Sequence, residues 1–395
     1  MKKYLDLGKS ALANSYLIRL DSKKPEPRYP LRVFCCSNCH LAQLIDIVDR
    51  KQLFDEYAYF SSTSPELDLH FKDFARHISQ RFPDQTKRMV LDIGSNDGVL
   101  LKHFRKLGST VLGIDPAKNV AETAQENGIP TLPLFFDHLQ AEKILKKYGP
   151  AGIITSNNTL AHTDNLHNIF SGIKKLLDIH GVFVFEVHYV GNILKKKEFD
   201  NTYHEHICYY SLAPILTLLA MHTMNAFDVE KVETHGGSIR VYASHPNVFP
   251  IKPSVKKLFD QEKKQGLHTF STYKKFSNVP QKIKKNLTAL LQKYKKQGKK
   301  IAGYGASAKG TTLLQYCQLG PQIIDYIVDN APSKQGKYTP GSHIPIKAPE
   351  HLKKDIPDIV VIFAWNYANS IMKKEAWLKK QGVKFVIPIP DIKVI

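Results

Sequence analysis

Four neighbouring side chains that can hold or pass on a proton stand together in the segment Tyr-His-Glu-His, residues 203–206. Two tyrosines and a cysteine follow within the next four residues. Histidine suits general-base catalysis because its ordinary pKa lies near neutrality. A phenol such as Tyr203, or a carboxylate such as Glu205, can orient that base or hydrogen-bond a developing enolate. We predict a proton-transfer site here. An exposed helix start is the alternative, and a metal cluster is disfavoured because His204 and His206 lack a clear third and fourth ligand.

A second polar group, Asn157, Asn158 and His162, directly follows an apolar run. If that run is a parallel strand, the loop after it faces the ligand site of the sheet. The two amides can then hold a cofactor's amino-acid end or the substrate, and His162 can act as an acid or a base. A polar surface group is the alternative.

The first glycine loop spans residues 92–98 and reads Asp-Ile-Gly-Ser-Asn-Asp-Gly. Gly94 and Gly98 allow the backbone to turn sharply and to approach a ligand closely. Asp115 lies 17 residues after Gly98, at the end of the next apolar run. A carboxylate at that position can accept hydrogen bonds from ribose hydroxyls.

The charge of this loop indicates which ligand it holds. Its G-x-x-x-G spacing departs from the G-x-G-x-x-G of dinucleotide sites, and its acids Asp92 and Asp97 would repel a diphosphate. S-adenosylmethionine (SAM) has no phosphate and carries a sulfonium and an ammonium group. We therefore predict SAM as the cofactor, with an ordinary strand-turn-helix corner as the alternative. The expected contacts are Asp92, Gly94, Asn96, Asp97, Gly98, Asp115, Asn157 and Asn158.

A second glycine loop, residues 303–310, has no acid and carries Lys309. Backbone N–H groups, a helix N-terminus and a lysine together suit a phosphate. We predict a nucleotide diphosphate here; an NAD site is the weaker alternative because the spacing is not G-x-G-x-x-G, and a domain without ligand is another. The expected substrate contacts are Gly303, Gly305, Ser307, Lys309, Asp329, Trp365 and Asn366.

Short apolar runs alternate with amphipathic segments in two parts of the chain, which predicts two parallel sheets covered by helices. A lysine-rich helical stretch that ends near Gly298 separates them. The fold class is therefore α/β, with two Rossmann-like sheets in tandem. Strands are expected at 89–93, 110–114, 152–156, 182–187, 300–304, 323–328 and 359–364, and helices at 99–107, 117–127 and 309–317.

The composition limits the kinds of binding partner that the chain can have. The 395 residues carry a formal net charge of +20, which by itself suggests nucleic acid. The lysines occur in pairs and triplets without interleaved stacking aromatics, so we expect solvated faces and no nucleic-acid partner. No apolar run is long enough to span a bilayer, and the first 20 residues lack a signal peptide's apolar stretch. We expect a cytoplasmic monomer.

The ordered set of motifs resembles one family, the SAM-dependent sugar C-methyltransferases that make branched deoxysugars. The resemblance covers nearly the whole chain. It includes the two glycine loops and the 203–211 segment. The other matching segments are 5–8, 30–39, 57–62, Asn157–His162 and 236–240.

The arrangement of expected strands and helices divides the chain into residues 1–75, 76–245 and 246–395. The resemblance implies that these are a small zinc-binding-like domain, a class I SAM methyltransferase domain and a Rossmann-like C-terminal domain. The implied substrate is a nucleotide-linked 4-keto-deoxysugar. The implied base is His206, which removes a proton next to the ketone, so that the resulting enolate attacks the methyl group of SAM. The alternative is a SAM-dependent methyltransferase of RNA, DNA or small-molecule oxygen.

The resemblance also assigns roles to individual residues. Tyr203, Glu205 and His162 match other active-site positions of the family. Tyr57 and Ser62 are expected in the cofactor site, and Arg240 in the substrate site.

A cysteine cluster at 35–39 is the remaining motif. A disulfide framework is improbable in a cytosolic chain. The family carries two Cys-x-x-Cys pairs, of which only the second is present here, as Cys36 and Cys39. Structural zinc needs four ligands, so zinc is expected only if Cys35 or His40 helps to hold it.

Overall fold

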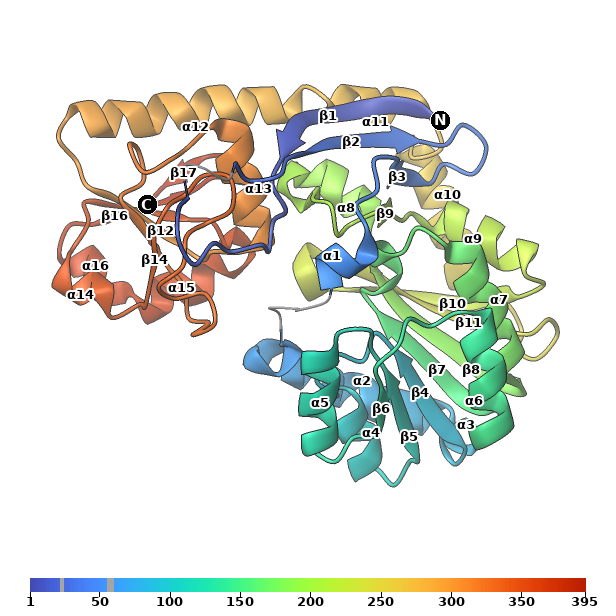
Figure 1. Ribbon diagram of the computed structural model, residues 1–395. Helices are drawn as coiled ribbons and strands as arrows, with labels where there is room; N and C mark the ends of the chain where they lie inside the picture. The colour runs from blue at the N-terminus through green and yellow to red at the C-terminus, as the bar shows by residue number, and fades with distance from the viewer. Residues whose placement is uncertain (22–24, 55–59) are drawn as a thin grey trace.

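The computed structural model describes residues 1–21, 25–54 and 60–395, and three sheets organise them (Figure 1). A four-stranded antiparallel sheet lies nearest the N-terminus, with buried and less buried residues alternating along its second strand. Its last strand comes from the segment directly after the 203–206 motif. Its order is β1 (Lys2–Ser10), β2 (Tyr29–Cys35), β3 (Ala42–Leu44), β9 (Cys208–Tyr209).

The middle sheet has seven strands, and its central strands are buried on both faces, as near-continuous apolar runs predict. β4 lies between β5 and β7, so the strand order reverses there and a crevice opens at the carboxyl ends of these strands. The order is β10 (Asn225–Val232), β11 (Ser238–Ser244), β8 (Leu177–His188), β7 (Ala151–Asn157), β4 (Met89–Ile93), β5 (Val111–Ile114), β6 (Thr131–Leu132).

Helices cover both faces of this sheet. One layer is formed by α2 (Pro65–Arg81), α4 (Leu101–Lys106) and α5 (Lys118–Glu126). The other is formed by α6 (His138–Tyr148), α7 (Leu166–Leu176) and α9 (Leu212–Met221). The short helices between these elements are α3 (Pro83–Thr86) and α8 (Val190–Lys195).

Helix α2 begins where the sequence directs it to begin. The Ser64 side chain accepts a hydrogen bond from the Leu67 amide (3.3 Å), and Pro65 occupies the first turn. Residues 65–75, which the sequence pattern assigned to the N-terminal part, pack on the middle sheet.

The C-terminal sheet repeats the crevice, because β12 lies between β13 and β15. The strand expected at 323–328 begins only at Tyr326, since the Ile323 and Ile324 amides donate to the Gly320 carbonyl and form a turn. The order is β14 (Ile346–Lys347), β13 (Tyr326–Val328), β12 (Ile301–Tyr304), β15 (Ile359–Ile362), β16 (Lys384–Ile387), β17 (Lys393–Val394).

The lysine-rich stretch forms three helices, α10 (Pro253–Lys264), α11 (Phe270–Phe276) and α12 (Val279–Lys296). The first packs with the middle core and the third with the C-terminal core. The remaining helices are α1 (Arg50–Phe54), α13 (Ala308–Cys317), α14 (His351–Lys354), α15 (Ala368–Lys374) and α16 (Ala376–Lys380). Of the helices that the structure describes, none has the length and apolar character that a bilayer crossing requires.

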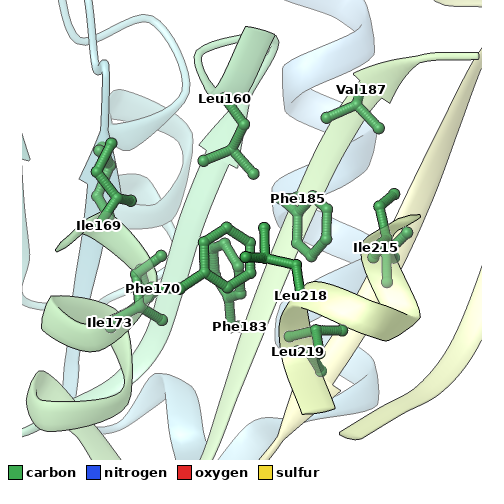
Figure 2. Close-up of a cluster of buried hydrophobic side chains, with 14 of the residues drawn as sticks. Leu160, Ile169, Phe170, Ile173, Phe183, Phe185, Val187, Ile215, Leu218 and Leu219 are labelled. Carbon is green, nitrogen blue, oxygen red and sulfur yellow. The ribbon is translucent and has the colours of Figure 1, made fainter. Parts of the chain in front are cut away.

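The main core that supports the crevice lies between the middle sheet and helices α7 and α9 (Figure 2). Phe170 packs edge-on against Phe183 and Phe185, at centroid distances of 5.9 and 6.3 Å, and those two rings stack at 4.6 Å. Burial of each such ring stabilises the fold by roughly 2–3 kcal/mol.

Truncation of this core tests its contribution. Phe170→Ala should lower the free energy of unfolding by about 3–5 kcal/mol, because the ring is 1% exposed and leaves a cavity. Leu139→Ala, at a position 64% exposed on α6, should change it by less than about 0.5 kcal/mol. Urea denaturation of both variants checks this; equal losses would contradict the assignment of the core.

Candidate active site

A cavity of about 380 Å³ opens at the crevice of the middle sheet. It is bounded by the first glycine loop, the 203–206 motif and the start of α13. Twelve of the residues predicted from sequence line it: Gly94, Asn96, Asp115, Asn157, Asn158, His162, Tyr203, Glu205, His206, Ser307, Lys309 and Asn366.

The His206 ring is held from two sides. Its Nδ1 lies 2.8 Å from the Asn201 carbonyl oxygen, and its Nε2 lies 2.7 Å from the Tyr203 hydroxyl. A carbonyl can only accept, so Nδ1 carries the hydrogen. In the neutral ring, Nε2 then carries the lone pair and accepts the hydrogen bond that the Tyr203 O–H donates.

Burial keeps two of the three histidines that line the cavity, His206 and His162, neutral. It lowers the pKa of His206 well below its ordinary value of 6.5, and neighbouring His162 lowers it further. Burial also lowers the pKa of His162, to about 4. The two rings meet edge to face at 5.1 Å. The cavity thus presents a neutral imidazole with a fixed tautomer, the form that a general base requires.

The N-terminal sheet and helix α13 of the C-terminal part hold the segment that carries this motif. Cys208 pairs with Gln43 of the N-terminal sheet, and His204 Nε2 lies 3.3 Å from the Tyr29 carbonyl. From the C-terminal side, the Thr312 hydroxyl donates to the Thr202 carbonyl (3.1 Å). The motif is therefore fixed by tertiary contacts on both sides.

The first glycine loop is fixed by Asp115. Its two carboxylate oxygens accept from the Asn96 amide (2.9 Å) and the Ala117 amide (3.0 Å). Burial raises the pKa of Asp115 to about 6, and that of Asp92, which accepts from the Thr155 hydroxyl (2.7 Å), to about 7. A cationic ligand would favour the charged form of both carboxyls.

Several predicted cofactor residues hold the loop in place, and of these Asp92, Asp97, Gly98 and Ser62 do not line the cavity. The Asn96 amide oxygen accepts from the Ser61 backbone N–H (2.8 Å), and an Asp97 oxygen accepts from that of Ser62 (3.1 Å). Asp92 and Gly98 are likewise buried in or behind the loop. Tyr57 lies outside the described residues.

The second glycine loop uses the same carboxylate device. Asp329 accepts from the Ala306 amide (2.7 Å) and the Ala331 amide (2.8 Å), and the Ser307 hydroxyl caps α13 at the Gly310 amide (3.1 Å). Asp329 therefore holds the loop and does not line the cavity. Gly303 and Gly305 also lie outside the cavity lining, where they pack against β13 and β15 and the residues that follow β15.

The positive charge of Lys309 has a nearby carboxylate, although its own loop contains no acidic residue. Its ammonium lies 3.9 Å from the carboxylate of buried Glu198 and 5.0 Å from the centre of the Trp365 ring. Trp365 itself donates from Nε1 to Asp200 (2.6 Å) and does not line the cavity. A second lysine, Lys334, reaches the cavity although no motif marks it.

Arg240 lies outside the cavity. Its guanidinium donates to the fully buried Glu186 through Nε (2.8 Å), and it lies 4.5 Å from the centre of the Phe74 ring. His70 contacts the other oxygen of Glu186 (2.9 Å). This arginine therefore compensates a buried carboxylate between strand β8 and helix α2.

Several cavity residues have no signal in the sequence. Some are apolar residues after β6, and others come from segments far from any motif. A search of the loops that follow every predicted strand would have found Thr159 and Thr163, but not the residues after β6, because the sequence did not predict that strand. The set comprises Asn14, Arg50, Ser61, Leu134, Phe135, Phe136, Thr159, Thr163, His188, Asn201, Lys334, Ala364 and Tyr367.

The cysteine cluster does not form a complete zinc site. In the part of the chain that the structure describes, no three His, Cys, Asp or Glu side chains are placed to hold one metal ion. Burial raises the pKa of the Cys35 thiol to about 11. Cys36 and Cys39 supply two of the four ligands that a structural site needs.

Family models match most of the chain. A model described as "Putative zinc binding domain" matches residues 1–54, one described as "Methyltransferase domain" matches residues 68–221, and one described as "C-methyltransferase C-terminal domain" matches residues 233–390.

Curated relatives agree with these models. The C-methyltransferase NovU of Streptomyces niveus is 34% identical over 392 residues, which span 99% of this chain and 93% of NovU. A ubiquinone biosynthesis O-methyltransferase of Glaesserella parasuis is 31% identical over 101 residues, which span 24% of this chain and 43% of that protein.

Solved structures align with part of the chain. The magnesium protoporphyrin IX methyltransferase of Synechocystis PCC 6803 with bound SAM has a TM-score of 0.35 and 13% identity, covering 45% of this chain and 79% of that chain. A SAM-dependent methyltransferase of Clostridium acetobutylicum has a TM-score of 0.35 and 15% identity, covering 44% of this chain and 92% of that chain.

Substitution of Gly94 tests whether the first loop holds SAM. This residue has a φ of +76°, and an added Cβ would lie 2.1 Å from the Thr159 hydroxyl oxygen. Gly94→Ala should displace the loop and weaken SAM binding at least about tenfold, measured by calorimetry. Gly108→Ala is the matched control, since Gly108 has a φ of +90° but open space around it. SAM affinity equal to wild type in Gly94→Ala would contradict this placement.

Proposed function

The chain belongs to the SAM-dependent C-methyltransferase family, and on that premise we propose that it methylates a carbon next to the ketone of a nucleotide-linked 4-keto-deoxysugar. The observation that carries the proposal is the neutral His206, whose Nε2 faces the Tyr203 hydroxyl in the same cavity as the first glycine loop. A carbon atom is a poor nucleophile until a neighbouring ketone allows its proton to be removed, so C-methylation requires such a base.

SAM, when bound, supplies an electrophilic methyl group. The Asn201 carbonyl holds the Nδ1–H of His206, which leaves Nε2 to accept the proton from the carbon next to the ketone. The electron pair of that C–H bond then delocalises onto the keto oxygen. Donors fixed around the enolate oxygen stabilise it without reorganisation, and the carbon then takes the methyl group.

Tyr203 is placed to stabilise the enolate that this proton transfer forms. Its O–H donates to Nε2 of His206, at 2.7 Å, so the substrate must displace this bond before His206 can act. Once displaced, the same O–H can donate to the keto oxygen as negative charge develops there. Burial keeps His162 neutral, so it can donate a hydrogen bond without bringing a positive charge.

The cations around the cavity support an anionic substrate. Lys309, Lys334 and Arg50 all line it, and each has a nearby carboxylate in this structure. A diphosphate accepts charge-assisted hydrogen bonds from lysine and arginine, and the N-terminus of α13 adds backbone donors. Lys309, Lys334 and the N-terminus of α13 support the assignment of the nucleotide to the C-terminal side of the cavity.

The proposal is tested by mass spectrometry of 4-keto-6-deoxysugar nucleotides incubated with the protein and SAM. One sugar should gain one methyl group. His206→Asn should lower turnover about 10²- to 10⁴-fold, while SAM affinity stays within about twofold of wild type. Full turnover by this variant, or methylation of none of the sugars by the wild type, would refute the proposal.

The pH dependence of kcat/KM gives an independent check. The neutral form of His206 is the active one, and its folded-state pKa is lowered, so protonation should inactivate the protein only well below pH 6.5. The rate should therefore stay level from pH 8 down to pH 6.5. The His162→Gln variant serves as the control for the other buried histidine. A titration centred near pH 6.5 that appears in both the wild type and His162→Gln would contradict the buried state of His206.

A further inference from the structure

The connection between β1 and β2 enters the active site from the N-terminal sheet. Figure 1 shows this segment, in dark blue, running from the end of β1 along the C-terminal sheet. The Ala11 amide donates to the Gln315 side chain (2.8 Å), the Tyr16 hydroxyl to the Ala306 carbonyl (2.6 Å) and the Leu17 amide to the Tyr338 carbonyl (3.0 Å). Residues 11–17, the strap, are thus fixed at both ends.

Between these anchors, Asn14 faces the proton-transfer motif. Its side-chain nitrogen donates to both carboxylate oxygens of Glu205, at 2.7 and 2.9 Å. Both residues line the cavity, and Glu205 is only 3% exposed. The Asn14 side-chain NH2 group has two N–H donors, so it can bond to both oxygens and direct the carboxylate, and each oxygen keeps further lone pairs.

We propose that Asn14 is a positioning residue for the reaction: its amide fixes the Glu205 carboxylate as the acceptor for a hydroxyl or amine of the sugar. The inference rests on the proposed function. An amide N–H can only donate, so this contact holds Glu205 as an acceptor and disfavours its use as a proton donor to the keto oxygen. That donation then falls to Tyr203, or to His162.

The chemistry of Asn14 suits this role. A lysine or arginine in its place would also hold the carboxylate but would neutralise its charge. The neutral amide fixes the orientation and leaves the negative charge of Glu205 directed at the substrate, where it strengthens a hydrogen bond from a sugar donor.

A purely structural contact is the competing explanation, and a double-mutant cycle separates the two. Asn14→Ala should lower kcat/KM for the keto-sugar roughly 10- to 100-fold, the value of a hydrogen bond to a charged group, with SAM affinity unchanged. Glu205→Gln should lower it as well. If Asn14 acts through Glu205, the double variant should be no slower than the slower single variant.

Tyr16→Phe is the matched control, since it breaks the other inward-facing bond of the strap. Its effect should add to that of Glu205→Gln and show no coupling. Additive losses for Asn14→Ala and Glu205→Gln would overturn the inference, as would an equal coupling for Tyr16→Phe.

The same proteins distinguish failure of this inference from failure of the proposed function. If the wild type methylates none of the keto-sugars, the proposed function fails. The affinities of the four proteins for a keto-sugar nucleotide, measured by calorimetry, then decide the role of Asn14: coupling between the two substitutions in that affinity supports it, and additivity overturns it.

Discussion

The bond between Nδ1–H of His206 and the Asn201 carbonyl is the constraint on which the proposed chemistry depends. It determines which ring nitrogen carries the lone pair and directs that nitrogen into the cavity. The segment that supplies this carbonyl costs free energy to fold, because its polar side chains are fully buried. These side chains are Glu198, Asp200 and Asn201. Contacts from Trp365 and Thr312 in the C-terminal part offset that cost. The position of His206 therefore depends on contacts between the middle and C-terminal parts of the chain.

The two Rossmann-like sheets hold their glycine loops in the same way. In each, an aspartate after the second strand accepts hydrogen bonds from a loop amide and from an amide two residues beyond itself: Asp115 in the middle sheet and Asp329 in the C-terminal sheet. The difference lies in what surrounds the loops. Asp115 borders the cavity, whereas Asp329 lies behind its loop and pairs with Lys334 at 3.6 Å.

Elements that depend on a short contiguous stretch of residues could be predicted from the sequence. Residues 89–93 form β4 as expected, because a run of buried apolar residues suits a central parallel strand. The glycine loops and the 203–206 motif were found because each is contiguous. The class I SAM methyltransferase fold, the C-methyltransferase family and the SAM cofactor expected from the motifs are confirmed. The nucleotide-sugar substrate and the residue roles stay predictions.

Contacts between segments far apart in the chain could not be predicted from the sequence. Asn14 meets Glu205 across 191 positions, and neither segment alone indicates the pairing. Lys309 sits in a loop without acids, yet Glu198 from another element compensates its charge. Arg240 is part of a motif of the family resemblance, but buried Glu186 needs a cation and takes it. Such pairings follow from burial in the assembled fold, which one sequence does not encode locally.

The most direct test is ¹⁵N NMR of the His206 ring, assigned by comparison with His206→Asn. The account predicts a neutral imidazole at pH 6.5, protonated at Nδ1 and with an acceptor-type shift at Nε2. An imidazolium at that pH, or a ring protonated at Nε2, would contradict it.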